Sequence, residues 1–101
     1  MLFVNMISEA IRHGHELLIR YRGGGVRVVE PHTLGVGSKG QLLMRAYQTG
    51  GDSKSGETDK WKTFLVDEID EVTDTGGASG PPRLGYRRND PLMKSGIIAE
   101  R

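Results

Sequence analysis

Apolar and polar residues alternate along much of the chain, and glycine-rich or charged segments interrupt the alternation. Since successive side chains of a β-strand point to opposite faces, a period of two predicts strands. We predict five of them: Leu17–Arg22, Val26–Glu30, Gln41–Gln48, Trp61–Val66 and Ile69–Thr73. The Gly23-Gly24-Gly25 run marks the first turn, because glycine adopts positive φ without steric cost.

The N-terminal segment changes to a helical period. Phe3, Ile7, Ala10 and Ile11 recur at helical spacing over residues 3–13, and Gly14 ends the pattern. Ser8 and Glu9 are expected to face water. A helix of about three turns is not stable alone in water, so we expect it to pack on the strands.

Breaks in the pattern predict how the chain is divided. Pro31 cannot donate to a strand ladder, so we expect it to end the second strand or to sit at an edge, and we expect Thr33–Gly40 to form a loop. A second, long loop is expected over Thr49–Lys60, which contains no apolar residue. From Thr75 the composition is linker-like. We therefore predict a domain over residues 1–75 and a tail over 76–101 that packs on the domain or on a neighbouring subunit.

Size and composition exclude several classes of protein. A chain of 101 residues with a net charge of +1 is one small domain with no global attraction to nucleic acid. It has no cysteine, no signal-peptide pattern and no apolar run of about 20 residues, which predicts a cytoplasmic protein without a membrane partner. His13, His15 and Glu16 are too few to predict a metal site. With no nucleophile beside a base and no paired catalytic carboxylates, we predict neither an enzyme nor a bound cofactor.

The candidate chemistry is that of anion binding. Three cations, one on each of three strands, could converge on an anionic ligand, or could be separate solvated charges: Arg27, Arg45 and Lys62. Three aromatic residues could stack on bases, or could pack in the core: Tyr21, Tyr47 and Trp61. His32 could donate to a ligand or be a buried structural histidine.

Two further motifs carry candidate chemistry. The tail carries a secondary basic and aromatic cluster of Arg83, Tyr86, Arg87 and Arg88, which could bind nucleic acid or an acidic partner, or pack on a neighbouring subunit. Gly35–Gly40 matches a dinucleotide-binding fingerprint on paper. A strand follows it where the motif needs a helix, so we reject that reading.

The chain resembles the WYL domain family. The resemblance lies in four pieces: Ile7–Arg22, Arg27–Gly35, Leu42–Tyr47 and Lys62–Ile69. It implies a mainly β (α+β) fold, in which an N-terminal helix precedes a small five-stranded Sm-like, SH3-type barrel, here with an extended C-terminal tail. The family's Trp-Tyr-Leu triplet is Leu42-Leu43-Met44 in this chain, and its Arg-x-Phe strand begins with Lys62. Lysine keeps the charge but not the bidentate fork of arginine.

The resemblance also implies a function. WYL domains are mostly ligand-sensing or nucleic-acid-sensing modules, whose ligand surface is lined by Tyr, Arg and His. We therefore expect a non-enzymatic module that recognises single-stranded nucleic acid or a nucleotide-like anion, and regulates transcription, phage defence or counter-defence, with a separate DNA-binding or effector partner. The alternative is a self-assembling, homo-oligomeric Sm-like adaptor or a nucleotide-sequestering protein.

Overall fold

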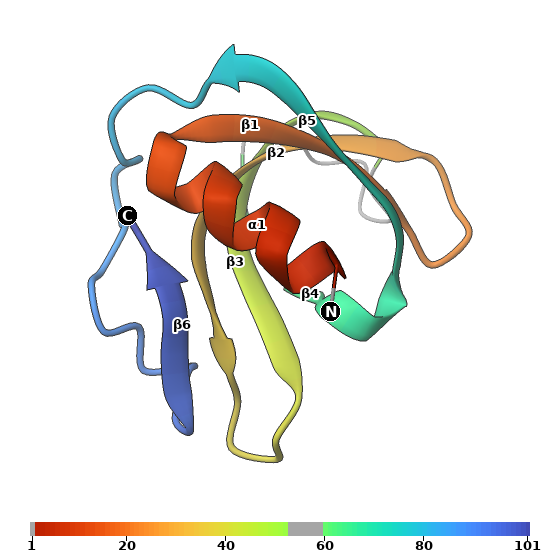
Figure 1. Ribbon diagram of the computed structural model, residues 1–101. Coiled ribbons are helices and arrows are strands. Elements are labelled where there is room, and N and C mark those ends of the chain that lie inside the picture. The colour runs from red at the N-terminus through yellow and green to blue at the C-terminus, as the bar shows by residue number, and fades with distance from the viewer. Residues whose placement is uncertain (1, 53–59) are drawn as a thin grey trace.

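One α-helix precedes six β-strands in the computed structural model, which describes residues 2–52 and 60–101 (Figure 1). The elements are α1 (Leu2–His13), β1 (His15–Tyr21), β2 (Val26–Val36), β3 (Leu42–Gly51), β4 (Lys60–Leu65), the 3-10 turn η1 (Val66–Glu68), β5 (Ile69–Ala78) and β6 (Gly96–Glu100). The predicted helix and five strands are present, although several strands are longer than predicted. The sixth strand, β6, lies in the tail, where the alternation was too short to predict one.

The strands form one antiparallel sheet in the order β4-β3-β2-β1-β5. The N-terminal part of β2 pairs with β1, while its C-terminal part, from Thr33 to Val36, pairs with β6. Among the described residues β4 and β5 do not pair with each other. The structure is therefore a strongly bent, open, six-stranded sheet, and the closed five-stranded barrel that we expected is not observed.

β2 does not end at Pro31, so of the two placements expected for this residue the edge position fits, and the loop predicted from Thr33 is wrong. The register against β3 shifts between Pro31 and Thr33, so that His32 is the extra residue of a β-bulge. On its other side, Pro31 lies between the part of β2 that pairs with β1 and the part that pairs with β6. The missing N–H of proline therefore costs no ladder hydrogen bond, and the strand continues.

The long loop predicted over Thr49–Lys60 is shorter than expected at both ends. β3 continues to Gly51 and β4 begins at Lys60. Residues 53–59 lie outside the described part of the chain. Likewise, β5 runs on to Ala78, through the boundary predicted after residue 75.

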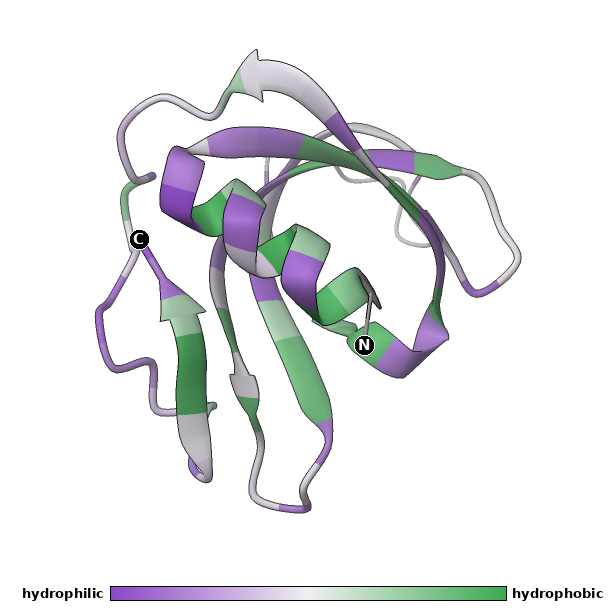
Figure 2. Cartoon of the chain, viewed as in Figure 1, coloured by the Kyte–Doolittle hydropathy of each residue, from purple (hydrophilic) through white to green (hydrophobic). Residues whose placement is uncertain are grey.

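The helix covers the opening of the bent sheet and closes the core (Figure 1). Figure 2 shows green and purple segments in turn along α1, as expected of a helix with one buried face. Ile7, Ala10 and Ile11 are buried in the core as predicted, but Ser8 is also buried rather than facing water. No helix in the described part of the chain is long and apolar enough to cross a membrane.

The sheet has two faces with different roles. The core face of β3 and β4 carries Met44, Ala46, Gln48 and Phe64, all of which are buried. The other face, which we call the tail face, carries the residues that alternate with these. The segment from Ser79 returns over the sheet to β6, and the Arg101 N–H donates to the His32 carbonyl oxygen at 2.9 Å. The tail thus packs on the sheet of its own chain.

Candidate ligand site between the sheet and the tail

Three of the predicted site residues share the tail face. Tyr47 on β3 is the cross-strand partner of Trp61 on β4, and Arg45 is the partner of Thr63. The Tyr47 and Trp61 rings meet edge to face with centroids 5.5 Å apart. The Arg45 guanidinium lies 5.4 Å from the Trp61 ring centroid, and its Nη1 donates to Thr63 Oγ1 at 2.9 Å. One cation and two aromatic rings therefore form a single group whose members contact one another.

The other two predicted cations do not join this group. The Arg27 guanidinium lies 5.6 Å from the centroid of Phe64, a core-face residue. Lys62 alternates with Trp61 along β4 and so belongs to the core face as well. The expectation that Arg27, Arg45 and Lys62 converge on one surface is wrong, because the period of the strands divides them between two faces.

Tyr21 is a core residue and not a stacking platform. Its side chain is buried and meets Phe64 edge to face at 5.0 Å. Its hydroxyl accepts a hydrogen bond from the Leu65 N–H at 2.9 Å. The aromatic ring thus fixes the end of β4 against β1.

His32, the bulge residue, holds the tail in place. Its side chain has no exposed surface. Nδ1–H donates to the Glu30 carbonyl oxygen at 2.8 Å, while Nε2 accepts from the Arg83 N–H at 3.1 Å. Desolvation by burial is the main cause that lowers the pKa of His32, so the ring is neutral, as this pair of hydrogen bonds requires. Of the two roles considered for His32, the geometry fits the buried structural one.

Arg83 of the tail completes the same attachment. Its guanidinium forms a bidentate pair with the buried Glu30 carboxylate, at 2.7 and 3.1 Å. It also lies 4.7 Å from the Tyr47 ring centroid. A residue of the chain itself therefore occupies the place on Tyr47 where we expected a ligand.

In the remainder of the tail cluster, Tyr86 and Arg88 bind other parts of the chain, whereas Arg87 is exposed. The Tyr86 hydroxyl and Arg88 Nη1 both donate to the Arg101 carbonyl oxygen at 2.7 Å. Desolvation raises the pKa of Tyr86, which keeps its hydroxyl a donor. Arg88 also pairs with Glu100 at 2.9 Å. Among the described residues Arg87 has no hydrogen-bond or ion-pair partner, so it is the cation of this cluster that remains available.

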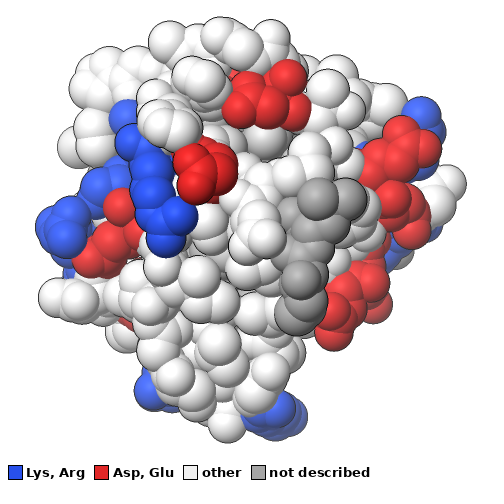
Figure 3. Space-filling model, viewed as in Figure 1, with Lys and Arg blue, Asp and Glu red and all other residues white. Residues whose placement is uncertain are grey.

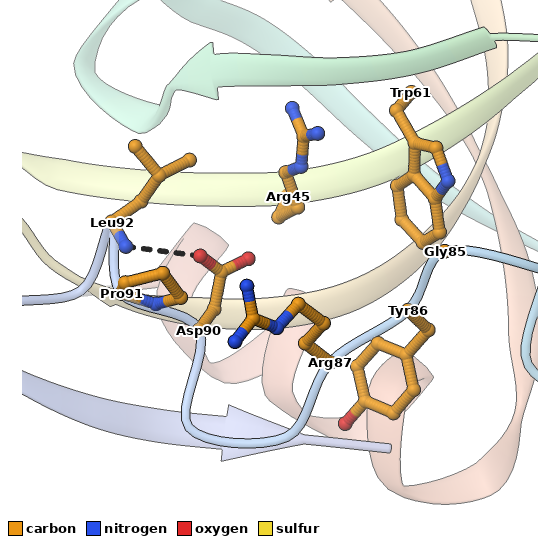
Figure 4. A pocket seen from close by; sticks show the side chains of 8 residues that line it. All are labelled: Arg45, Trp61, Gly85, Tyr86, Arg87, Asp90, Pro91 and Leu92. Carbon is orange, nitrogen blue, oxygen red and sulfur yellow. Dashed lines mark hydrogen bonds between the residues drawn. The ribbon is translucent and has the colours of Figure 1, made fainter.

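A cavity of about 210 Å³ opens between the tail face and the tail (Figure 4). Two of its residues come from strands, Arg45 and Trp61, and six come from the tail: Gly85, Tyr86, Arg87, Asp90, Pro91 and Leu92. Its charged groups are two guanidiniums and one carboxylate. Such a cavity can take a planar, partly apolar group that carries hydrogen-bond acceptors or negative charge.

Gly85 lets the tail lie against the edge of Trp61. A Cβ atom at this position would lie 3.0 Å from Trp61 Nε1, and the residue has a φ of +94°. The indole N–H donates to the Leu84 carbonyl oxygen at 2.9 Å. The short Cβ distance and the indole hydrogen bond show that the tail backbone lies close to Trp61, and a side chain at residue 85 would disturb this contact.

The sequence reasoning missed the wall of the cavity from Asp90 to Leu92. It named Glu30 only as a charge that could pair with a strand cation or tune His32, and the pair of Glu30 with Arg83 was not predicted. The Asp90-Pro91 pair indicates only a turn. Its position opposite Arg45 depends on how the tail returns.

We expect the stability of the fold to fall in mild acid because of His32. The pKa of His32 in the folded state is below the value of about 6.5 that it has in the unfolded chain, so the unfolded state takes up the proton first. The contribution of neutral His32 to the free energy of unfolding is therefore fully present above about pH 6.5. The free energy of unfolding falls as the pH drops toward the folded-state pKa, by at most about 1.4 kcal/mol per pH unit. Urea unfolding at a series of pH values measures this slope.

The controls for this experiment are two histidine variants. His32→Gln should remove most of the slope between pH 7 and 5. His13→Gln, at an exposed position of α1, should leave it unchanged. Equal slopes in wild type and His32→Gln would contradict the assignment.

Comparison with known protein families identifies the general class. The candidate site lies in a small domain built on a bent sheet. The chain belongs to the WYL domain family, whose model matches residues 3–74, which confirms the resemblance. WYL domains are generally regulatory domains that bind ligands or nucleic acid. Neither the curated proteins nor the solved structures contain a significant match to the chain. The match includes Arg45 and Trp61 but none of the six tail residues of the cavity.

Proposed function

We propose that the chain is a non-enzymatic regulatory module that binds a nucleotide-like anion, or the terminal nucleotide of a single strand, in the cavity under the tail. The observation that carries this proposal is the presence of Arg45 and Arg87 in one cavity beside Trp61. Arg45 is positioned by β3 and Arg87 by the tail. A group bound between them would therefore link the two parts of the chain.

The chemistry of the cavity fits such a ligand. Guanidinium groups form the strongest hydrogen bonds of proteins with phosphate and similar anions. Trp61 on one side and Pro91 and Leu92 on the other supply apolar walls for a planar ring. Base stacking on aromatic side chains contributes about 1–3 kcal/mol per base.

Size and charge favour a small ligand over a long strand. A volume of about 210 Å³ is below the ~300–1,000 Å³ of sites that enclose a drug-sized molecule. It accommodates one base, and the remainder of the ligand would extend into solvent. Figure 3 shows basic groups interspersed with acidic ones on the face in view, where α1 lies, so this face has no continuous basic track for the backbone of a long strand.

The regulatory part of the proposal rests on family membership. WYL domains are generally regulatory, and we propose that this one acts in the cytoplasm, in control of transcription or in phage defence or counter-defence. A separate DNA-binding or effector protein would carry the output. Ligand binding would change how firmly the tail is held, because most of the cavity wall belongs to the tail.

The test uses Trp61, the one tryptophan of the chain, as a fluorescent reporter inside the site. Titration with nucleoside monophosphates and short single-stranded oligonucleotides should change its emission saturably, with affinity that falls as salt rises. Arg87→Gln should weaken binding about tenfold or more, since a charge-assisted contact contributes about 1.5–3 kcal/mol. No saturable change with any of these anions would refute the proposal.

Arg12→Gln is the matched control. Arg12 is also an exposed arginine, located on α1, and it does not line the cavity. Its removal lowers the net charge by the same amount as Arg87→Gln. Equal losses of affinity in the two variants would indicate general electrostatic attraction instead of a site.

A further inference from the structure

We infer that the cavity selects guanine among the bases, an inference that rests on the proposed function. The reason is the carboxylate of Asp90, which shares a cavity with two guanidiniums (Figure 4). A site for phosphate alone gains nothing from a carboxylate, because like charges repel. A ligand that presents both acceptors and donors would use all three groups.

The three charged groups differ in how many of their hydrogen-bond donors or acceptors are left for a ligand. Asp90 Oδ1 accepts the Leu92 N–H at 2.9 Å, and its Oδ2 has no hydrogen-bond partner among the described residues. Arg45 is half-buried and oriented by Trp61 and Thr63, which leaves most of its five donors available. Arg87 is exposed at the rim. The half-buried groups of the cavity thus offer a fork of donors and one acceptor, and the exposed Arg87 offers a second cation.

Guanine complements this arrangement of groups. Its O6 and N7 are adjacent acceptors, and arginine recognises them bidentately. Its N1–H and N2 amino group are adjacent donors on another edge, suited to a carboxylate oxygen. Adenine places an amino donor beside N7, where the Arg45 fork needs an acceptor. Uracil lacks the amino group. Cytosine has adjacent acceptors at N3 and O2, but its N4 amino group is its only donor on that edge, so it lacks the second adjacent donor that guanine offers to a carboxylate.

The inference assigns one role to each residue. Arg45 recognises the O6 and N7 edge, Asp90 accepts from N1–H or the N2 amino group, and Arg87 contacts the phosphate outside. Trp61 limits the plane of the base on one side, and Pro91 on the other. Asp90 is then the specificity-determining residue, and it lies outside the part of the chain that the family model matches.

The experiment compares the monophosphates of guanosine, adenosine, cytidine, uridine and inosine on the full chain, by Trp61 fluorescence and calorimetry. We expect the guanosine compound to bind about tenfold tighter than those of adenosine, cytidine and uridine. The inosine compound retains O6, N7 and N1–H but lacks the N2 amino group, so it should fall between. Asp90→Asn keeps an oxygen for the Leu92 N–H and should reduce the guanine preference, measured as the ratio of the two affinities, to about twofold or less.

Asp67→Asn, a change of the same kind in η1, serves as the control and should keep the preference. Circular dichroism and thermal unfolding establish that both variants are folded. Equal affinity for all five compounds would overturn the guanine inference and leave the proposed function standing. A preference that persists in Asp90→Asn would also overturn the role of Asp90. Absence of binding by every compound would overturn the inference together with the proposed function.

Discussion

Replacing Arg83 with alanine should lower the free energy of unfolding by about 2–4 kcal/mol. Glu30 keeps only 7% of its side-chain surface exposed and pairs with Arg83 through two hydrogen bonds. Breaking a buried pair by removing one partner costs about 3–5 kcal/mol, because the other charge stays buried without compensation. Arg83 is 41% exposed, so water can replace part of what is lost. Urea unfolding followed by circular dichroism measures the change.

A double-variant cycle separates the pair from its surroundings. Glu30→Gln combined with Arg83→Ala should be less destabilised than the sum of the single variants, because no unpaired charge remains. Arg12→Ala, which removes an exposed arginine whose nearest carboxylate is 3.7 Å away, should change stability by less than about 0.5 kcal/mol. A loss for Arg83→Ala as small as that of Arg12→Ala would show that the pair does not hold the tail.

Alanine at Gly35 should lower the free energy of unfolding by about 2–3 kcal/mol and loosen β6. A Cβ atom on Gly35 would lie 2.6 Å from the Gly96 carbonyl oxygen, and 2.8 and 2.9 Å from Met93 side-chain atoms. The oxygen belongs to the backbone of the neighbouring strand and cannot rotate away. Overpacking of this kind costs about 1–3 kcal/mol. Hydrogen exchange of the β6 amides, in addition to urea unfolding, should show faster opening of the tail.

Gly50→Ala is the matched control for Gly35→Ala. Gly50 is also a strand glycine, but a Cβ there would meet its nearest neighbour, Val28, at 3.7 Å, which is an ordinary contact. We expect a change of less than about 1 kcal/mol and no effect on the exchange of β6. Equal effects of the two substitutions would show that the close approach of β6 to β2 is not what Gly35 is needed for.

The attachment of the tail and the cavity are parts of one arrangement. Arg83 fixes the tail at one side of the cavity, and the β2–β6 pairing beside Gly35 fixes it at the other. Six of the eight cavity residues lie between these two points. Variants that release the tail should therefore also lose the ligand, even though neither Arg83 nor Gly35 lines the cavity.

Local pattern was sufficient for the helix and for five of the six strands in the described part of the chain. The loose alternation of Leu17, Ile19 and Tyr21 with Leu18 and Arg20 predicted β1, since the strand period is visible in a short window. The alternation of Leu43, Arg45 and Tyr47 with Met44 and Ala46 predicted β3 in the same way. The same pattern carried the resemblance that the family model confirms. The site was harder to predict. A period of two shows which residues share a face within one strand, but it does not show which residues of different strands lie on the same face of the sheet.

The errors share one cause. Thr33–Gly40 was expected to be a loop, yet β2 continues past Pro31, which lies between two partners of the strand where no donor is needed. Arg27 and Arg45 were expected on one surface, yet the register places them on opposite faces of the sheet. His32 points toward the tail because of a bulge. In each case the position of the residue depends on the neighbouring strand, which a short stretch of sequence does not contain.

The sequence by itself determined the helix, five of the strands, the family and the type of chemistry that the chain can offer. Hydrophobic period, turn residues and residue type act over a few positions, and these properties follow from them. The tertiary structure decided which groups meet. Return of the tail over β2 and β3 brings Arg83 to Glu30, and Asp90 and Arg87 to the side of Arg45 and Trp61. Contacts between residues some 50 positions apart result from packing of the whole chain, and for that reason only the folded structure could place them.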